Sequence, residues 1–282
     1  MNIEKILPNG GPSIQEVKKY IEKYSNEIIV IKCGGSVLLE KNLFNQFVED
    51  ISIVNKLGLS SIVVHGGGKN IKKKLAEKNI KSNFINGLRV TDEKMIKIVE
   101  EALLELNYEI LNNIKNYHAN AESVTPKHGN IIKIIPEKKE LGFVGYPSEI
   151  NKKKLLEIIN DKKVPVVLPM GTGEDGKVYN INADTAAGSL AQELNSRRLL
   201  LMTDVEGVLD KNNKLIAEIN SEVAKQMLND GTISDGMIPK IKTCLNAVNN
   251  GVTGVVIVDG RKPHSILFEL FSDKGAGTLI RK

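Results

Sequence analysis

The sequence predicts an α/β protein, a three-layer α/β/α sandwich with a central, mostly parallel sheet and one appended helix at the N-terminus. Short runs of Ile, Val and Leu alternate along the chain with longer amphipathic segments. Strands of a parallel sheet covered by helices on both faces contain such aliphatic runs. Two of the runs end in glycine clusters, at residues 34–35 and 66–68. Such clusters are typical of anion-binding loops at the carboxyl ends of parallel strands.

The composition argues against several classes of protein. The chain has 282 residues, 41% of them hydrophobic, so we expect one large domain or two joined lobes. The net charge is +5, and lysine supplies almost all of the positive charge. No aromatic residues interleave with the lysine runs, which disfavours nucleic-acid binding. No apolar run reaches the roughly 20 residues that span a membrane. The two cysteines suit neither a disulfide framework nor a metal cluster. We therefore expect a cytoplasmic protein, or a stromal one if the chain is plastid-derived, without a metal ligand set of its own.

The first predicted helix covers residues 13–25, inside an N-terminal extension of residues 1–27. Ser13 and Glu16 have the spacing of a capping box. Apolar residues recur on one helical face, at Ile14, Val17, Tyr20, Ile21 and Tyr24. That face must be buried, either on the chain's own domain or on another subunit, and the pattern leaves both open.

The remaining elements alternate between strand and helix. Strands are predicted at 28–33, 61–65, 164–168, 198–203, 254–258 and 277–281, and short strands with turns within 122–148. Helices are predicted at 40–57, 68–79, 92–118, 151–160, 182–195, 221–229, 238–250 and 264–272. Each half of the chain has its own strands, so we expect lobes at 28–195 and 196–282 that share one sheet.

Lysine and glycine occur together where phosphate chemistry would need them. Lys32 ends a buried strand, where a charge requires an anionic partner. That partner is either an internal carboxylate or a bound phosphate, and the adjoining Gly34 and Gly35 favour phosphate. Lys240 follows Pro239 in what we expect to be the first turn of a helix. Taken alone, Lys240 would be an ordinary surface residue.

Two further segments carry candidate binding residues, and a third only resembles a nucleotide-binding motif. Asn180, Asn182 and Asp184 precede a helix of small residues, where one of them serves as a cap and the amides suit a polar ligand. Arg89 lies in a glycine-containing loop and could bind a carboxylate through two hydrogen bonds. The segment 171–176 fits G-x-G-x-x-G, but the residues after it look like a strand, whereas a dinucleotide-binding loop must begin a helix. We predict a hairpin turn there.

Taken together, these motifs resemble the amino-acid kinase family from about residue 28 to the C-terminus. The matching motifs, in order, are Lys32-Cys-Gly-Gly-Ser36, His65-Gly-Gly-Gly68, Asn86-Gly-Leu-Arg89-Val-Thr, Asn180-Ile-Asn182-Ala-Asp184, Thr203-Asp204-Val-Glu-Gly207-Val208 and Gly236-Met-Ile-Pro-Lys240. The resemblance implies the amino-acid kinase fold. Its Arg89 segment further implies ATP-dependent phosphorylation of the side-chain carboxylate of N-acetyl-L-glutamate, a step of arginine biosynthesis. Mg²⁺ would be carried on the ATP phosphates.

The resemblance also implies a role for each motif. Lys32 and Lys240 would flank the transferred phosphoryl group, on the attacking and leaving sides respectively, and Asp184 would hold both. The substrate-binding residues would be Gly67, Gly68, Arg89, Asn180 and Asn182, and the nucleotide-binding residues Gly34, Gly35, Thr203, Asp204, Gly207 and Val208. The acceptor carboxylate, with a pKa near 4.3, is already ionised at neutral pH, so no general base is required. Catalysis would come from positioning and charge neutralisation.

The N-terminal helix and the C-terminal segment resemble the arginine-inhibited branch of that family. This resemblance implies a hexamer built as a trimer of dimers and feedback inhibition by L-arginine. The effector site would contain Tyr20, His264, Glu269 and Gly275. The resemblance leaves open whether a nitrogen-signalling regulatory protein is a partner. The alternatives are a sister kinase for glutamate, aspartate, carbamate or a nucleotide, a catalytically silent arginine-binding regulator, and, more remotely, an NAD-dependent dehydrogenase.

Overall fold

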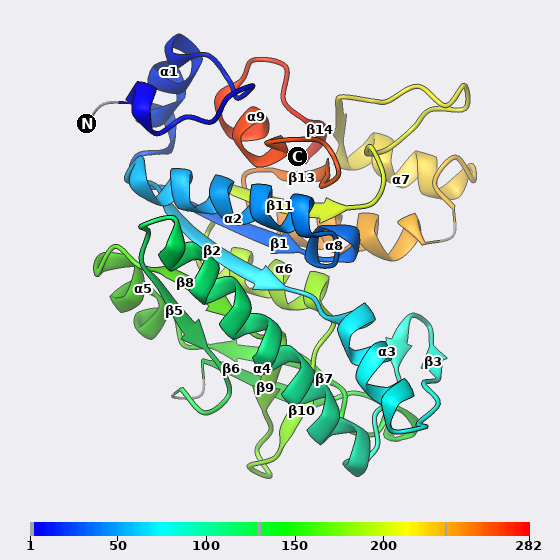
Figure 1. Cartoon of the computed structure of the whole chain (residues 1–282). Helices are drawn as coiled ribbons and strands as arrows, with labels where there is room; N and C mark the ends of the chain where they lie inside the picture. The colour runs from blue at the N-terminus through cyan, green and yellow to red at the C-terminus, as the bar shows by residue number, and fades with distance from the viewer. Residues whose placement is uncertain (1–2, 129–130, 235) are drawn as a thin grey trace.

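Eight strands form the central sheet of the computed structural model, in the order β12–β14–β13–β11–β1–β2–β8–β5 (Figure 1). The structure describes residues 3–128, 131–234 and 236–282. The strands are β1 (Ile28–Cys33), β2 (Ser60–His65), β5 (Ala121–Val124), β8 (Val164–Val167), β11 (Arg198–Thr203), β12 (Glu218–Asn220), β13 (Val255–Asp259) and β14 (Gly277–Arg281). Neighbours run parallel except β13 and β14, which are antiparallel. The prediction of a mostly parallel sheet is confirmed.

Helices cover both faces of this sheet, as predicted (Figure 1). One face packs against α1 (Ile14–Tyr24), α2 (Lys41–Lys56), part of α4 (Glu93–Asn116) and α9 (Ser265–Phe271). The other packs against α5 (Lys152–Asn160), α6 (Ala183–Glu193), α7 (Ser221–Asn229) and α8 (Met237–Asn249). Successive side chains of a strand point to opposite faces of the sheet. Ile29 and Ile31 therefore pack on the side of α2 and α9, whereas Val30 packs on the side of α6 and α8.

A smaller sheet and a hairpin extend the part of the chain before residue 195. The smaller sheet has the order β10–β9–β6–β7, formed by β6 (Ile132–Pro136), β7 (Gly145–Ile150), β9 (Met170–Thr172) and β10 (Val178–Asn180). β9 and β10 are antiparallel, which confirms the hairpin predicted at 171–176. The separate hairpin pairs β3 (Phe84–Ile85) with β4 (Leu88–Arg89), near α3 (Gly68–Glu77) (Figure 1). Short 3₁₀ helices occur at Ile3–Lys5, Gly35–Leu38 and Lys139–Leu141.

The N-terminal helix packs on its own chain. The predicted capping box is present, with Ser13 and Glu16 bonding reciprocally. Val17 and Tyr24 are buried, and α1 contacts α9. Part of the predicted apolar face therefore packs on the chain's own domain, while Ile14, Tyr20 and Ile21 are half-buried.

Helix α8 begins at Met237, one residue before the predicted start at 238, so Pro239 is its third residue. The first four N–H groups of a helix have no partner within it, so a proline at the third position costs no hydrogen bond. Lys240 is consequently the fourth residue of α8. No helix in the described part of the chain is long and apolar enough to cross a bilayer.

Candidate active site

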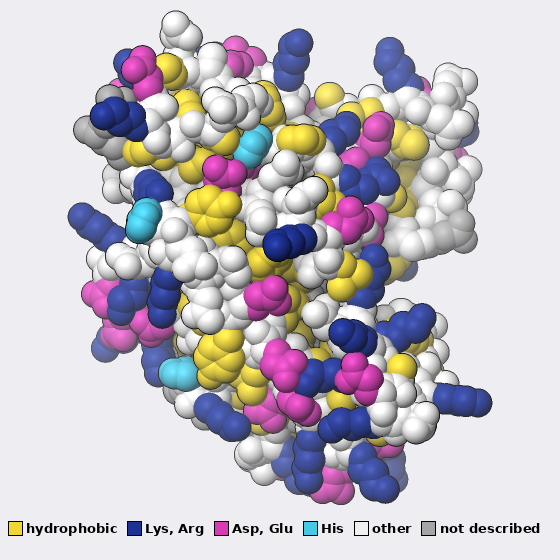
Figure 2. Space-filling model, in the orientation of Figure 1, with side chains coloured by type: hydrophobic (Ala, Val, Ile, Leu, Met, Phe, Trp, Pro, Cys, Tyr) yellow, Lys and Arg dark blue, Asp and Glu magenta, His cyan; other side chains and the backbone are white. Residues whose placement is uncertain are grey.

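A cavity opens at the carboxyl ends of β1 and β2, between the hairpin β3–β4 and the start of α6. Figure 2 shows the molecule hollowed on its right side, between the part that holds α3 and the part that holds α7 and α8, with Lys and Arg side chains gathered around the hollow. The cavity lining includes Lys32, Gly34, Gly35, Gly67, Gly68, Arg89, Asn180, Asn182 and Asp184. The fold therefore brings together nine residues from four of the predicted motifs.

The first glycine loop joins β1 to a short 3₁₀ helix. Gly35 has φ +64°, and a Cβ there would lie 2.6 Å from Asp204 Oδ1. Both facts require glycine at this position. The Asp204 carboxylate accepts a hydrogen bond from the Ser36 N–H at 2.9 Å. Asp204 thus fixes the loop from behind, and it does not line the cavity.

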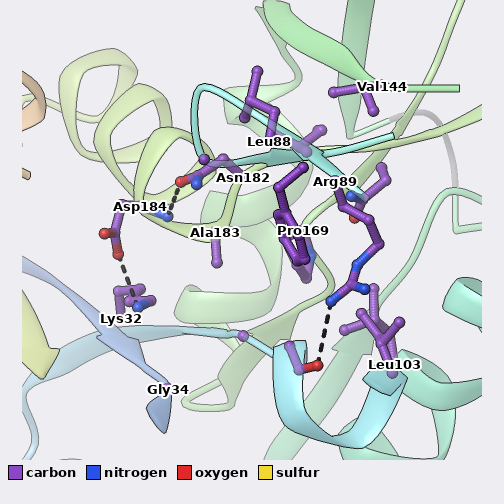
Figure 3. A pocket seen from close by; sticks show the side chains of 18 of the residues that line it. Lys32, Gly34, Leu88, Arg89, Leu103, Val144, Pro169, Asn182, Ala183 and Asp184 are labelled. Carbon is purple, nitrogen blue, oxygen red and sulfur yellow. Dashed lines mark hydrogen bonds and ion pairs between the residues drawn. The ribbon is translucent and has the colours of Figure 1, made fainter. Parts of the chain in front are cut away.

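Two lysines converge on one carboxylate beside this loop. Lys32 Nζ lies 2.9 Å from Asp184 Oδ1, and Lys240 Nζ lies 2.8 Å from Asp184 Oδ2. The three side chains are only 13%, 15% and 19% exposed, for Lys32, Lys240 and Asp184 in turn. Figure 3 shows the Lys32–Asp184 contact at one end of the cavity. Residues more than 50 positions apart in the sequence therefore form one cluster of charge.

Burial and charge act in opposite directions on this cluster. Burial alone would raise the pKa of Asp184, but the positive charges of Lys32 and Lys240 outweigh it and hold that pKa well below its usual range. Burial alone would lower the pKa of Lys32, but the charge and hydrogen bond of Asp184 raise it. The carboxylate and the Lys32 ammonium are therefore both ionised at neutral pH.

The second glycine loop, Gly66–Gly68, is held by a buried polar network. His65 Nδ1 lies 2.9 Å from the Gly66 carbonyl oxygen and donates to it, so Nε2 accepts from Asn107 Nδ2 at 3.1 Å. Ser123 donates to the Asn107 side-chain oxygen at 2.6 Å. Burial lowers the pKa of His65 to about 4, so the ring is neutral. His65 supports the loop and is enclosed too completely to act as a base on a ligand.

Arg89 reaches the cavity from the hairpin. Its guanidinium donates to Ser82 Oγ. It also donates, at 3.3 Å, to the Gly68 carbonyl oxygen (Figure 3). Arg89 is 7% exposed, and burial lowers its pKa. Among the described residues, no carboxylate forms an ion pair with it. The cationic group faces a cavity in which an anionic ligand could pair with it.

The two asparagines before α6 differ in what they do. Asn182 caps the helix, because its side-chain oxygen accepts from the N–H groups of Asp184 and Thr185 at 2.9 and 3.1 Å. This cap fixes the start of α6, the helix that carries Asp184. Asn180 ends β10 and lines the cavity, and its side-chain amide has no partner among the described hydrogen bonds. Asn180 is thus the better placed of the two to contact a ligand.

The segment 203–208 lies apart from the cavity. Thr203 ends β11, and its carbonyl oxygen accepts from the Gly260 N–H at 2.9 Å. The Val208 N–H donates to Thr278 Oγ1 at 2.9 Å, and its side chain is buried in the core. Gly207, with φ +144°, has no room for a Cβ beside Thr278. The assignment of this segment to a nucleotide site stays a prediction.

A second cavity lies where α1, α9 and β14 meet. Three of the predicted effector residues line it, namely Tyr20, Glu269 and Gly275. Glu269 accepts from the Ala276 N–H at 2.8 Å, and burial raises its pKa. Sequence reasoning missed other residues of the lining, namely Lys23, Tyr24, Arg198, Ala217, Glu218, Ser272, Asp273, Lys274, Gly277 and Leu279. Lys23 and Tyr24 could have been found, because they follow Tyr20 at helical spacing.

His264 does not line this second cavity, and its role as an effector residue stays a prediction. It precedes α9 with φ +52°, and its Nδ1 lies 2.7 Å from the buried Asp50 Oδ1 of α2. The hydrogen bond that His264 donates to Asp50 raises the pKa of His264, while burial raises that of Asp50 to about 6. The pair ties the start of α9 to α2 and leaves Glu269, farther along the helix, to face the cavity.

Comparisons with known proteins agree on a family. The sequence model of the amino acid kinase family matches residues 27–259. The acetylglutamate kinase of Pelagibacter ubique (strain HTCC1062) is 57% identical over 277 residues, covering 98% of this chain and 96% of that protein. The acetylglutamate kinase of Rhodospirillum centenum (strain ATCC 51521 / SW) is 43% identical, covering 95% and 92%.

Solved structures share the fold at low sequence identity. The N-acetylglutamate synthase of Neisseria gonorrhoeae complexed with coenzyme A and N-acetyl-glutamate has a TM-score of 0.86 at 21% identity, covering 96% of this chain and 64% of that one. The carbamate kinase of Giardia lamblia bound to AMP-PNP has a TM-score of 0.69 at 16% identity, covering 91% and 98%.

Proposed function

This chain belongs to the amino acid kinase family and is a phosphotransferase with a carboxyl acceptor, and from that premise we propose the identity of its substrates. The enzyme phosphorylates the side-chain carboxylate of N-acetyl-L-glutamate with ATP, giving N-acetyl-L-glutamyl 5-phosphate and ADP, as a step of arginine biosynthesis. One observation carries the proposal: Lys32 and Lys240 converge on Asp184, and Lys32 and Asp184 line a cavity together with Arg89, which has no carboxylate partner among the described residues.

The chemistry needs charge neutralisation more than proton transfer. A carboxylate oxygen of the acceptor attacks the γ-phosphorus of ATP, and the bond from that phosphorus to the ADP oxygen breaks. Both reactants are anions, so the barrier comes largely from their repulsion. Lys32 approaches from the end of β1 and Lys240 from α8. We assign Lys32 to the attacking side and Lys240 to the leaving side, with Asp184 holding the two apart at fixed positions.

Arg89 and its neighbours suit the acceptor. Arg89 would bind the α-carboxylate through parallel hydrogen bonds, and Asn180 the adjoining polar groups. Gly67 and Gly68 would supply backbone N–H donors. The apolar part of the lining, including Leu88, Leu103 and Val144, suits an acetyl methyl group.

We assign the nucleotide mainly to the other half of the chain. The segment Thr203–Val208 at the carboxyl end of β11 would bind ATP, together with Gly34 and Gly35 from the first glycine loop. In this assignment residues 28–195 bind the acceptor and contribute that loop, residues 196–282 bind the nucleotide, and residues 1–27 form an oligomerisation and regulatory extension.

Magnesium fits this site only as part of the nucleotide. Among the described residues that line the cavity, Asp184 is the one carboxylate, and both of its oxygens contact lysines. No described group of three or more His, Cys, Asp or Glu side chains could hold an ion. We therefore expect Mg²⁺ to be bound by the ATP phosphates, where it would neutralise charge.

A coupled ADP-release assay tests the substrate assignment. Turnover with N-acetyl-L-glutamate should exceed turnover with free L-glutamate, aspartate or carbamate by at least about a hundredfold, because the acetyl group fills the apolar lining and removes the ammonium charge. Hydroxylamine should trap the product as a hydroxamate in a one-to-one ratio with ADP. Faster turnover with an unacetylated acceptor would indicate a sister kinase, and absence of any turnover would indicate a binding protein.

The second cavity supports a regulatory role, with L-arginine as the effector. Glu269 is a buried carboxylate that could pair with the guanidinium, and Lys23 and Arg198 could receive the effector's carboxylate. Tyr20 Oη already donates to Asp273 at 2.5 Å, so α1 forms part of the cavity wall. Activity measured with millimolar arginine should fall, and an unchanged rate would contradict this role.

The assembly is a further part of the proposal. We expect a hexamer, a trimer of dimers, in which α1 contributes to contacts between subunits. Light scattering on the purified protein should then give about six times the chain mass of 31.0 kDa. A cytoplasmic location and a nitrogen-signalling protein partner stay predictions of the resemblance.

A further inference from the structure

The hairpin β3–β4 sets an aromatic ring opposite Arg89. Its turn residues Asn86 and Gly87 have φ +49° and +80°, the combination that a two-residue type I′ turn requires. Such a turn fixes the register, and Phe84 pairs directly with Arg89 across the two strands. Residues paired in this way project side chains on the same face of the hairpin. The pairing therefore follows from local turn chemistry.

The Arg89 guanidinium lies over the Phe84 ring. The Arg89 Cζ atom lies 4.7 Å from the centre of the Phe84 ring. Phe84 is 57% exposed, although an aromatic side chain normally gains by being buried. A cation–π contact gives the exposed ring a function that packing in the core does not supply.

This contact leaves the hydrogen-bonding edge of Arg89 available. An arginine has five N–H donors, all in the plane of the guanidinium. Ser82 and the Gly68 carbonyl oxygen accept from two of its nitrogens. The Phe84 ring holds the cation by a cation–π contact without accepting a hydrogen bond, whereas an internal carboxylate would compete with a ligand for these donors. The geometry thus prepares Arg89 to receive a carboxylate in the plane of its guanidinium.

We propose that Phe84 is a positioning residue that sets the affinity for the α-carboxylate of the acceptor by holding the Arg89 guanidinium in plane. The inference rests on the proposed function, because it takes the acceptor to be N-acetyl-L-glutamate. Phe84 acts on the binding of one end of the substrate and has no part in the transfer of the phosphoryl group at the other. Its loss should therefore weaken substrate and transition state equally.

Steady-state kinetics of Phe84→Leu test the proposal. KM for N-acetyl-L-glutamate should rise about three- to tenfold, the range expected for loss of one cation–π contact. The kcat and the KM for ATP should stay within about twofold of the values of the unaltered enzyme. The reason is that the lost contact contributes equally to binding of the substrate and of the transition state. Phe84→Tyr keeps an aromatic face and should restore the KM. Ile85→Ala is the matched control, because Ile85 is exposed on the same hairpin and does not line the cavity.

A truncated ligand separates positioning from simple apolar contact. 4-Acetamidobutanoate lacks the α-carboxylate, so its inhibition constant against N-acetyl-L-glutamate should be the same in Phe84→Leu and in the unaltered enzyme. An unchanged KM in Phe84→Leu, or an equal loss of affinity for both ligands, would overturn the proposal while the proposed function stands. If the unaltered enzyme fails to phosphorylate N-acetyl-L-glutamate, the proposed function fails first, and the inference with it.

Discussion

Replacing Asp184 by Asn removes the negative charge that two lysines share. The ammonium groups of Lys32 and Lys240 lie 2.9 and 2.8 Å from its two oxygens, and all three side chains are less than one-fifth exposed. Coulomb's law with an effective dielectric constant of about 20 gives a gross attraction of roughly 6 kcal/mol for each contact. Desolvation of the charges offsets much of this. Removing one partner of a buried pair costs about 3–5 kcal/mol net.

The same loss should appear in stability and in catalysis. For a chain of this length, about 3–5 kcal/mol corresponds to a fall in Tm of about 5–10 °C. If the lysines also leave their positions, kcat should fall by about two to four orders of magnitude. KM for ATP should not rise, because the variant site carries one more positive charge. A lower kcat with an unraised KM for ATP would show that the lysines are no longer held in place, and not that nucleotide binding is lost.

The assay compares Asp184→Asn with Glu193→Gln, an exposed carboxylate near the end of the same helix α6. Thermal unfolding establishes that each variant is folded at the assay temperature, and ADP release with N-acetyl-L-glutamate gives kcat and both KM values. The control should match the unaltered enzyme in each measurement. If folded Asp184→Asn retained a kcat within tenfold of the unaltered enzyme, the reasoning from the lysine–aspartate cluster would be refuted.

Two other perturbations test the second cavity and the buried His264 pair. Glu269→Gln should raise the arginine concentration for half-inhibition about 10- to 100-fold, because a charge-assisted hydrogen bond is lost, and an unaltered inhibition curve would argue against an arginine site there. His264→Gln should lower Tm by about 2–5 °C at pH 6. The hydrogen bond that His264 donates to Asp50 raises the pKa of His264, so the stabilisation is fully present below the unfolded pKa of about 6.5 and is lost as pH rises through the folded pKa. The Tm difference between the unaltered protein and His264→Gln should therefore narrow toward pH 8.5, and a difference that widens with pH would contradict the ion pair.

Much of the fold could be predicted because each element carries its own local signal. The aliphatic run of β1, the capping box at Ser13 and Glu16, and the cap at Asp92 all lie within a few residues of the element that they specify. Local signals fix bounds well where a cap is present. At α8 the predicted start at 238 missed by one residue, and the N-cap residue there, Gly236, has no side chain with which to cap the helix.

The candidate site was harder to predict where partners come from distant helices. The ordered motifs indicated that Lys32, Asp184 and Lys240 belong together, and the sheet brings them to one edge. No sequence pattern links His65 to Asn107, or His264 to Asp50, because those pairs depend on how α4 and α2 pack. The partner of a buried polar group is set by tertiary structure, so the support that His65 gives to the glycine loop could not be predicted from the sequence.

The central claim is that Lys32 and Lys240 act together on one phosphoryl group, and the kcat values of Lys32→Ala, Lys240→Ala and the double variant test it most directly. We predict that each single variant loses at least about a hundredfold in kcat, and that the double variant is little slower than the slower single one, because residues that work as a unit are not additive. Near-normal turnover in either single variant, or losses of activation free energy that add in full, would contradict the account.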